Sequence, residues 1–263
     1  VATCMIFSPF FAKLGGHVDV SRSVAFGVVL ICIALMMFIV YFFMDRKLDA
    51  QTGEAEEKED PFKISDLGKI LTSMGFWLVA LLCVLYYSAI FPFQKYAVNM
   101  LQCNLTFHEL PAGSFWASSS VTMVQYVIML VVAATAFMYN FMKRKALKNT
   151  MLLLSILSLV LYCYMGYMRQ SAESIFAVFP LLAVGITPIL GSYVDHKGKA
   201  ASMLVLGSLL LILCHLTFAF VLPLFKTSQV GGVIVAYVTI LVLGASFSLV
   251  PASLWPSVPK LVD

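Results

Sequence analysis

Long apolar stretches alternate along this chain with short polar connections. A helix that crosses the hydrocarbon core of a bilayer needs about 20 mostly apolar residues. Seven stretches meet this requirement: residues 23–44, 74–97, 116–142, 149–168, 174–194, 202–224 and 230–250. Residues 1–12 have the composition of the end of an eighth span, and Val1 already lies inside it, so we interpret the chain as a fragment of a longer protein. The pattern predicts an all-α, polytopic membrane protein.

Composition supports the same class. Apolar residue types make up 61% of the 263 residues and charged types only 11%, against about a quarter charged in a typical soluble domain. A soluble fold of this size has too little interior to bury so much apolar surface. No basic stripe is interleaved with aromatic residues, so we do not expect nucleic acid as a partner.

The basic residues lie mostly in alternate connections. One set of connections carries twelve: Arg46, Lys47, Lys58, Lys63, Lys69, Lys143, Arg144, Lys145, Lys148, Lys197, Lys199 and Lys260. The other set carries four: Lys13, Arg22, Arg169 and Lys226. Because cytoplasmic loops carry an excess of Lys and Arg, the first set is expected in the cytoplasm, and seven alternating crossings reproduce this division.

No pattern in the sequence indicates an active site. The six cysteines include no CxxC pair and no spacing with histidine that suits zinc. Paired carboxylates and phosphate-binding glycine loops are missing from the polar stretches. We therefore expect no metal, no cofactor and no enzymatic activity.

The most specific motif is GSYVDHKGKA, residues 191–200, on the basic side between two spans. Gly191 would allow a helix end to pack closely against a neighbour. Asp195 would cap the next helix or pair with a cation, and Gly198 would permit a turn with positive φ. Lys199 marks the cytoplasmic face. The alternative is an ordinary loop, since short connections between spans often contain these residue types.

This loop resembles the cytoplasmic motif of the major facilitator superfamily, in which it joins the second and third helices of each six-helix half. VLYYSAIFPF (84–93) and ASLWPSV (252–258) resemble elements of the lysosomal dipeptide transporter branch and its bacterial relatives. The resemblance implies a partial major-facilitator helical bundle. Residues 1–44 would end the N-terminal half, 45–72 would form a cytoplasmic linker, and 73–263 would form most of the C-terminal half.

The chain departs from the superfamily pattern in one place. Two spans stand between the helix at 74–97 and the helix that leads into the motif, where the superfamily has none. We interpret residues 116–168 as an inserted two-helix hairpin at the edge of the bundle, facing lipid. Its basic turn at 143–148 would anchor the topology; binding of anionic lipid is the alternative.

Polar side chains inside spans are candidates for the solute path, because their burial in lipid is costly. The candidates are Tyr86, Tyr87, Gln94, Lys95 and Trp255. Tyr87 and Gln94 are seven residues apart and share a helix face, with Tyr86 and Lys95 on either side of it. Two alternatives remain: Lys95 reaches the outer interface on its long stem, or the hairpin covers the polar face through Gln125 and Tyr126. His215 would be neutral and bonded to a neighbouring helix.

These observations favour a secondary transporter that moves a small solute, such as a dipeptide or a related organic molecule, by alternating access. The alternatives are a membrane scaffold that transports nothing and a membrane-embedded enzyme. The expected partners are the solute and the lipid bilayer. We expect a bacterial inner membrane, or a lysosomal or other membrane if the chain is eukaryotic.

Overall fold

The computed structural model describes residues 20–52, 71–111 and 113–254, and these residues form helices and connecting turns without a strand. Seven helices are long and apolar enough to cross a membrane. They match the seven predicted spans one for one, so the prediction of an all-α, multi-pass membrane protein is confirmed. Trp255 and most of the linker predicted at 45–72 lie outside the described residues.

The chain divides into two units, Val1–Ser73 and Met74–Asp263. In the first unit the structure describes one long helix, α2 (Val20–Thr52), whose candidate span is Val24–Lys47. The helix continues through residues 45–52, the first part of the linker predicted at 45–72. Most of its described side chains are exposed, as expected for a helix whose surroundings are lipid or other parts of the protein.

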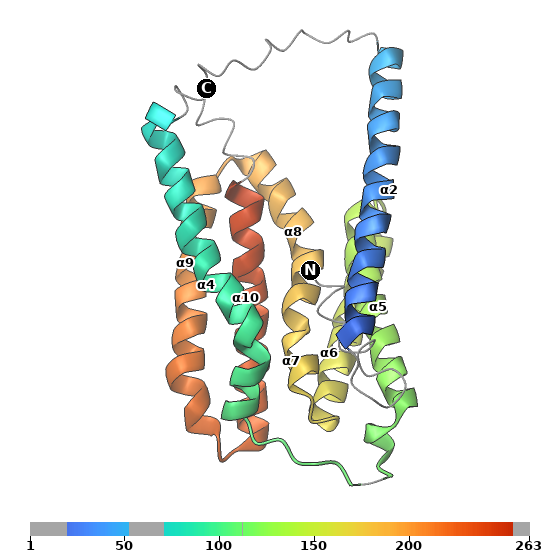
Figure 1. The fold of residues 1–263 in the computed structure, drawn as a ribbon, viewed down its shortest axis with the longest axis vertical. Coiled ribbons are helices and arrows are strands. Elements are labelled where there is room, and N and C mark those ends of the chain that lie inside the picture. Colours follow the sequence, from blue (N-terminus) through green and yellow to red (C-terminus); the bar gives the residue numbers. More distant parts are fainter. Residues whose placement is uncertain (1–19, 53–70, 112, 255–263) are drawn as a thin grey trace. The chain divides into compact units, whose positions relative to one another are not determined.

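The second unit contains the other six spans, which run alternately up and down (Figure 1). Its elements are α4 (Met74–Asn104), η1 (Phe115–Ala117), α5 (Ser119–Phe141), α6 (Lys145–Met168), α7 (Ala172–Phe176), α8 (Val178–Lys197), α9 (Ala200–Leu216), the π-helical η2 (Thr217–Val221), η3 (Leu222–Phe225) and α10 (Gln229–Leu254). Lys143, Arg144, Lys145, Lys148, Lys197 and Lys199 lie at the end of this bundle where α5 and α8 finish. Arg169 and Lys226 lie at the opposite end.

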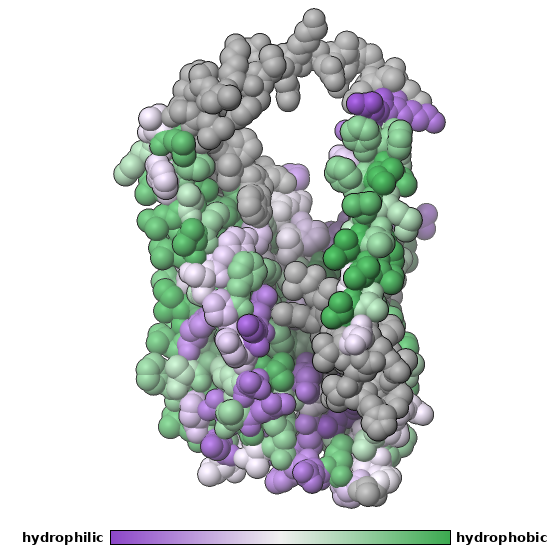
Figure 2. Space-filling model, in the orientation of Figure 1, coloured by the Kyte–Doolittle hydropathy of each residue, from purple (hydrophilic) through white to green (hydrophobic). Residues whose placement is uncertain are grey.

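Helix α10 is the centre of this unit and packs along both α8 and α9. Small residues allow the close approach that membrane helices need when no water drives them together. A Cβ at Gly244 would lie 3.1 Å from the Phe179 carbonyl, and one at Gly207 would lie 2.9 Å from Val250. The hairpin α5–α6 packs on the other side of α8. Apolar side chains cover much of the visible outer surface (Figure 2), which suits contact with lipid.

Candidate functional site

Helix α4 has a buried face and an exposed face. Ile90 and Leu101 are fully buried on the first, and Phe91 and Lys95 are exposed on the second. Apolar residues that recur at helical spacing form the buried face, and this face packs against α7, α10 and η3. Figure 2 shows polar side chains gathered on the lower half of α4. The exposed face is therefore apolar toward one end and polar toward the other.

The two adjacent tyrosines of α4 have different surroundings. Tyr86 is only 4% exposed, and its hydroxyl donates to the carbonyl of Ser246 on α10 at 3.3 Å. The Tyr87 ring is half-buried and stacks on Phe91, with ring centroids 5.2 Å apart. Tyr86 thus belongs to the interior of the bundle, whereas Tyr87 lies at the border of the exposed face.

Gln94 and Lys95 follow Tyr87 by two turns. Gln94 is half-buried, and Lys95 is exposed with its ammonium 5.7 Å from the centre of the Tyr96 ring. Within the described part of the chain Lys95 has no ion pair. Gln125 does not cover this polar face, because its side chain is engaged elsewhere in the bundle.

Phe93 joins α4 to the irregular part of α9. Its ring stacks on Phe218 at 5.1 Å and meets His215 edge-on at 5.2 Å. His215 bonds the Leu211 carbonyl of its own helix through Nδ1 at 2.9 Å, which corrects the expectation of a bond to a neighbouring helix. Its Nε2 is buried and has no partner among the described residues. Two residues after His215, at Thr217, the helix widens into the π-helical segment η2, a distortion common at functional sites.

A second polar cluster lies at the end of the hairpin opposite the basic turn. Arg169, just after α6, donates through Nη1 to the Gln125 side-chain oxygen and through Nη2 to Thr122 at 2.8 Å. The Ser174 hydroxyl on α7 donates to the same Gln125 oxygen at 3.3 Å. Gln125 is 3% exposed, and its Nε2 and the Arg169 Nε have no partner among the described residues. Burial lowers the pKa of the Arg169 guanidinium, and the charge of Glu173 opposes that shift.

Sequence reasoning did not find this cluster. In the sequence, Arg169 is one of the four basic residues in the less basic set of connections, and Gln125 is only a possible cover for α4. The available signal was the spacing of Thr122 and Gln125, which puts two polar side chains on one face of an otherwise apolar helix. The hairpin therefore has an exposed face suited to lipid and a buried face with polar bonds to α7.

The motif loop has the turn expected at Gly198 but not the close packing expected at Gly191. Gly198 ends α8 in the left-handed region at φ 66° and donates its N–H to the Val194 carbonyl. A Cβ at Gly191 would meet no atom within 4 Å, so this glycine is not needed there for close packing. Helix α9 begins after Lys199, whose own side chain does not cap it. Asp195 lies in the last turns of α8, and its side chain is outside the described structure.

At the end of the bundle opposite the basic turn, an open depression of about 540 Å³ lies between the ends of α4, η3 and α7. Its lining includes Gln102, Thr106, Gln170, Glu173 and Lys226. The Thr106 hydroxyl donates to the Lys226 carbonyl at 2.7 Å, and Gln229 donates to Gln170. These bonds connect the loops at this end of the bundle.

Within the described ranges no group of three His, Cys, Asp or Glu side chains is placed to hold a metal ion. The fold and these polar groups define a multi-pass helical membrane protein with polar side chains inside its spans. Comparison with family models, curated proteins and solved structures finds no match for the chain.

Proposed function

We propose that the chain belongs to a secondary transporter of the major facilitator type, which moves a small organic solute by alternating access, and that α4 borders the solute path. The observation that carries this proposal is the polar border of α4 formed by Tyr87, Gln94 and Lys95. Lys95 is exposed in an apolar helix and has no ion pair among the described residues.

The position of these groups favours a water-filled path over lipid. An amide and an ammonium that face hydrocarbon lose their hydration, which is why such residues are rare on lipid-facing surfaces. The buried side of the same helix is already occupied by Tyr86 and Phe93, which contact α10 and α9. The buried side thus holds α4 in the bundle, and the exposed Lys95 faces away from these contacts.

Irregular helices nearby support movement of this region. Pro92 lies inside α4 and cannot donate a main-chain hydrogen bond, and α9 changes to a π-helix at Thr217–Val221. Phe93 connects the two irregular points through its ring contact with Phe218. Interrupted helices are the usual places where transporters bind solutes and bend.

The test is uptake of a panel of small peptides by the full-length protein in vesicles. Lys95→Met is expected to raise KM about tenfold or more, since a hydrogen bond to a charged group contributes about 1.5–3 kcal/mol. Tyr87→Phe is expected to have a smaller effect, because it removes one hydroxyl and keeps the ring. Lys95→Arg is the charge-conserving comparison and should retain most of the uptake.

Tyr164→Phe is the matched control for Tyr87→Phe. Tyr164 is an exposed tyrosine on α6, and its ring contacts Trp116 rather than any residue of α4. Uptake should be normal in this variant. Normal affinity and rate in both Lys95→Met and Tyr87→Phe would remove α4 from the solute path and with it the main support for the proposed function.

The bilayer and the solute are the partners in this proposal, and the chain is proposed to act without a cofactor and without catalysing a reaction. A bacterial inner membrane is the proposed location. The major-facilitator assignment also predicts a second copy of the loop motif about four spans before the linker of the full-length protein. Reading that sequence separates a transporter of this type from a membrane scaffold or enzyme.

A further inference from the structure

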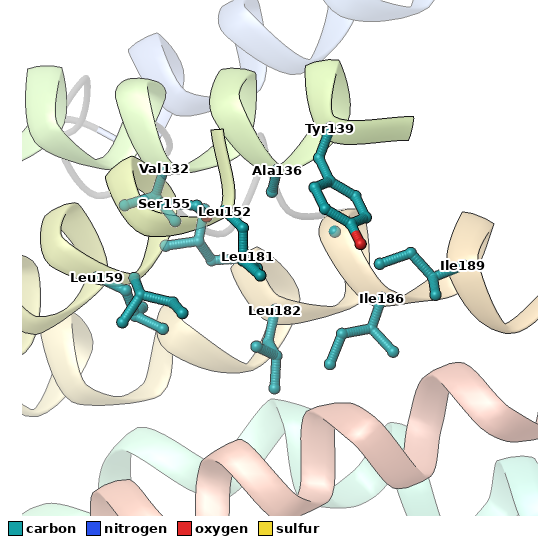
Figure 3. Close-up of a pocket in the computed structure, with 12 residues that line it drawn as sticks. Val132, Ala136, Tyr139, Leu152, Ser155, Leu159, Leu181, Leu182, Ile186 and Ile189 are labelled. Carbon is teal, nitrogen blue, oxygen red and sulfur yellow. The ribbon is translucent and has the colours of Figure 1, made fainter. Parts of the chain in front are cut away.

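An apolar crevice of about 230 Å³ lies between α5, α6 and α8 (Figure 3). Its walls include Val132, Ala136, Tyr139, Leu152, Leu159 and Ile189. Tyr139 and Ile189 lie at one end and Leu159 at the other. The hydroxyls of Tyr139 and Ser155 are the only side-chain polar groups in its lining. A volume lined in this way suits a hydrocarbon chain and offers a polar solute almost nothing to bond.

The crevice runs along the helices and opens to the membrane. From Tyr139 to Val132, and again from Leu152 to Leu159, is seven residues, or about 10 Å of helix. Leu152 is 45% exposed and Ile189 42% exposed, so its edges face outward. On its inner side α5 and α8 touch, because a Cβ at Gly185 would lie 2.9 Å from that of Ala136. An acyl chain can enter from the bilayer and stops at this contact.

Basic side chains stand at one end of the crevice. Tyr139 lies two residues before the end of α5, and the turn that follows carries Lys143, Arg144 and Lys145. The Lys148 ammonium lies 4.6 Å from the centre of the Tyr139 ring, which is itself part of the crevice lining. The Tyr139 ring therefore contacts the basic turn and also forms one end of the apolar crevice.

No acidic side chain among the described residues pairs with the positive charge of this turn. No acidic residue occurs between Glu109 and Glu173 in the sequence, and the four basic residues form no ion pair within the described residues. The positive-inside rule places the turn at the cytoplasmic leaflet. Anionic lipids are enriched there, and each Lys or Arg near the surface favours them.

We propose that this crevice is a binding site for an anionic phospholipid, with one acyl chain between α5, α6 and α8 and the phosphate held by Lys145 and Lys148. The apolar lining and the positive charge together select for this ligand. A neutral lipid would fill the crevice but would not pair with the basic turn, and a free phosphate would pair with the turn but would leave the crevice empty. The site is separate from the polar border of α4 and does not depend on what the protein transports.

The test uses the full-length protein in phosphatidylcholine vesicles with a minor fraction of phosphatidylglycerol. Trp77, Trp116, Trp255 and every tryptophan in the rest of the full-length protein are replaced by Phe, and Ile189→Trp at the outward edge supplies a fluorescent reporter. Bromine on the acyl chains of one lipid or the other quenches the reporter when that lipid is bound. Brominated phosphatidylglycerol should quench at a lower mole fraction than brominated phosphatidylcholine, by roughly fivefold for each basic group that contacts the phosphate.

Two pairs of substitutions separate the site from general surface charge. Lys145→Gln with Lys148→Gln should abolish the preference for phosphatidylglycerol, whereas Lys197→Gln with Lys199→Gln at the neighbouring basic loop should retain it. Equal loss in both pairs, or no loss in the first, overturns the proposal.

The crevice itself is tested by Ser155→Phe, which fills it from α6 and should reduce quenching by phosphatidylglycerol to the level of phosphatidylcholine. If that variant does not elute as a single folded species, Ser155→Leu is the smaller replacement. If the filled variant still prefers phosphatidylglycerol to phosphatidylcholine, the acyl chain does not bind in this crevice. Equal quenching of the unfilled protein by the two lipids overturns the site as a whole.

Discussion

The hydroxyl of Tyr237 on α10 donates to the main-chain carbonyl of Cys163 on α6 at 2.9 Å and occupies the space beside Gly166. A Cβ at position 166 would overlap that hydroxyl and lie 3.2 Å from the Cβ of Ser174. One glycine thus lets the central helix bond directly to the second helix of the hairpin. The bond also lies next to the Gln125 cluster, since Gln125 Nε2 would be 3.7 Å from the same Cβ.

Gly166→Ala should lower the stability of the protein by about 1–3 kcal/mol, because an extra methyl group in a packed interior forces its neighbours to move. The measurement is the thermal unfolding midpoint of the detergent-solubilised protein. In a Tyr237→Phe background the same substitution should lower the stability clearly less, because the Tyr237 hydroxyl that the new Cβ would overlap is absent. Coupled residues show such non-additivity, and strict additivity would place the Tyr237 hydroxyl away from Gly166.

Gly191→Ala is the matched control for that experiment. It also adds a methyl group to a helical glycine, but no atom lies within 4 Å of the new Cβ. Because alanine is the better helix former by about 1 kcal/mol, this variant should melt at or slightly above the temperature of the unmodified protein. If Gly191→Ala lowers the unfolding midpoint as much as Gly166→Ala does, the destabilisation in both variants arises from the loss of glycine's backbone freedom and not from a steric overlap.

Gln125 is expected to be more important as an acceptor than as a donor. Its oxygen accepts from both Arg169 and Ser174, while its Nε2 has no partner among the described residues. Gln125→Leu should therefore destabilise the protein by about 1–3 kcal/mol, because it leaves buried donors unbonded. Gln125→Glu keeps the side-chain oxygen that accepts these bonds and removes the unbonded amide NH2 group. The unfolding midpoint of this variant should therefore equal or exceed that of the unmodified protein.

Thr135→Val provides the comparison on the same helix. Thr135 is also buried on α5, but its hydroxyl donates to Val131 of its own helix at 2.7 Å and holds no other element. Its replacement should change the midpoint little. If Gln125→Leu is as mild as Thr135→Val, the Arg169 cluster does not stabilise the hairpin.

The spans could be predicted from sequence because hydrophobic length is a local property. The span expected at 116–142 is found at Ser119–Phe141, and that at 202–224 is found at Ala200–Phe225. The span expected at 74–97 continues to Asn104. Polar residues beyond the hydrocarbon region end the apolar stretch in the sequence. They do not end the helix, because its main-chain hydrogen bonds form within the helix itself.

Which face of a helix meets which neighbour could not be predicted in this way. Spacing alone separated Tyr86 from Tyr87, but only the packing of α4 on α10 shows that Tyr86 is the buried one. Arg169 was indistinguishable from an ordinary outer-loop cation, because the residues that bond it are 44 and 47 positions away in the sequence. Long-range pairing of this kind leaves no periodic signal.

The turn at Gly198 gives a test of the motif that does not require transport. Gly198 adopts φ 66°, which a residue with a side chain reaches only at a cost of about 1–2 kcal/mol. Gly198→Ala should therefore lower the unfolding midpoint, and Gly198→Asn should lower it less, because asparagine tolerates the left-handed region. Equal effects of the two substitutions would indicate that the side chain's bulk, and not its backbone preference, decides the outcome.

The last prediction concerns the direction in which the chain crosses the membrane. Cys103 is exposed at the end of α4 away from the basic turn and lines the open depression there, whereas Lys145 lies at the basic turn where α6 begins. With the other native cysteines replaced by alanine, Cys103 should react with an impermeant thiol reagent added to intact cells. In a chain that also lacks Cys103, Lys145→Cys should react only after the cells are permeabilised.

The physical reason is the asymmetry of charge, since the basic turn resists transfer across the membrane and stays in the cytoplasm. Lys197→Cys lies at the same end of the bundle and serves as an independent inner position. It should be shielded in sealed cells to the same extent as Lys145→Cys. Labelling of either inner position before permeabilisation, together with protection of Cys103, would reverse the topology and would move the lipid site to the outer leaflet.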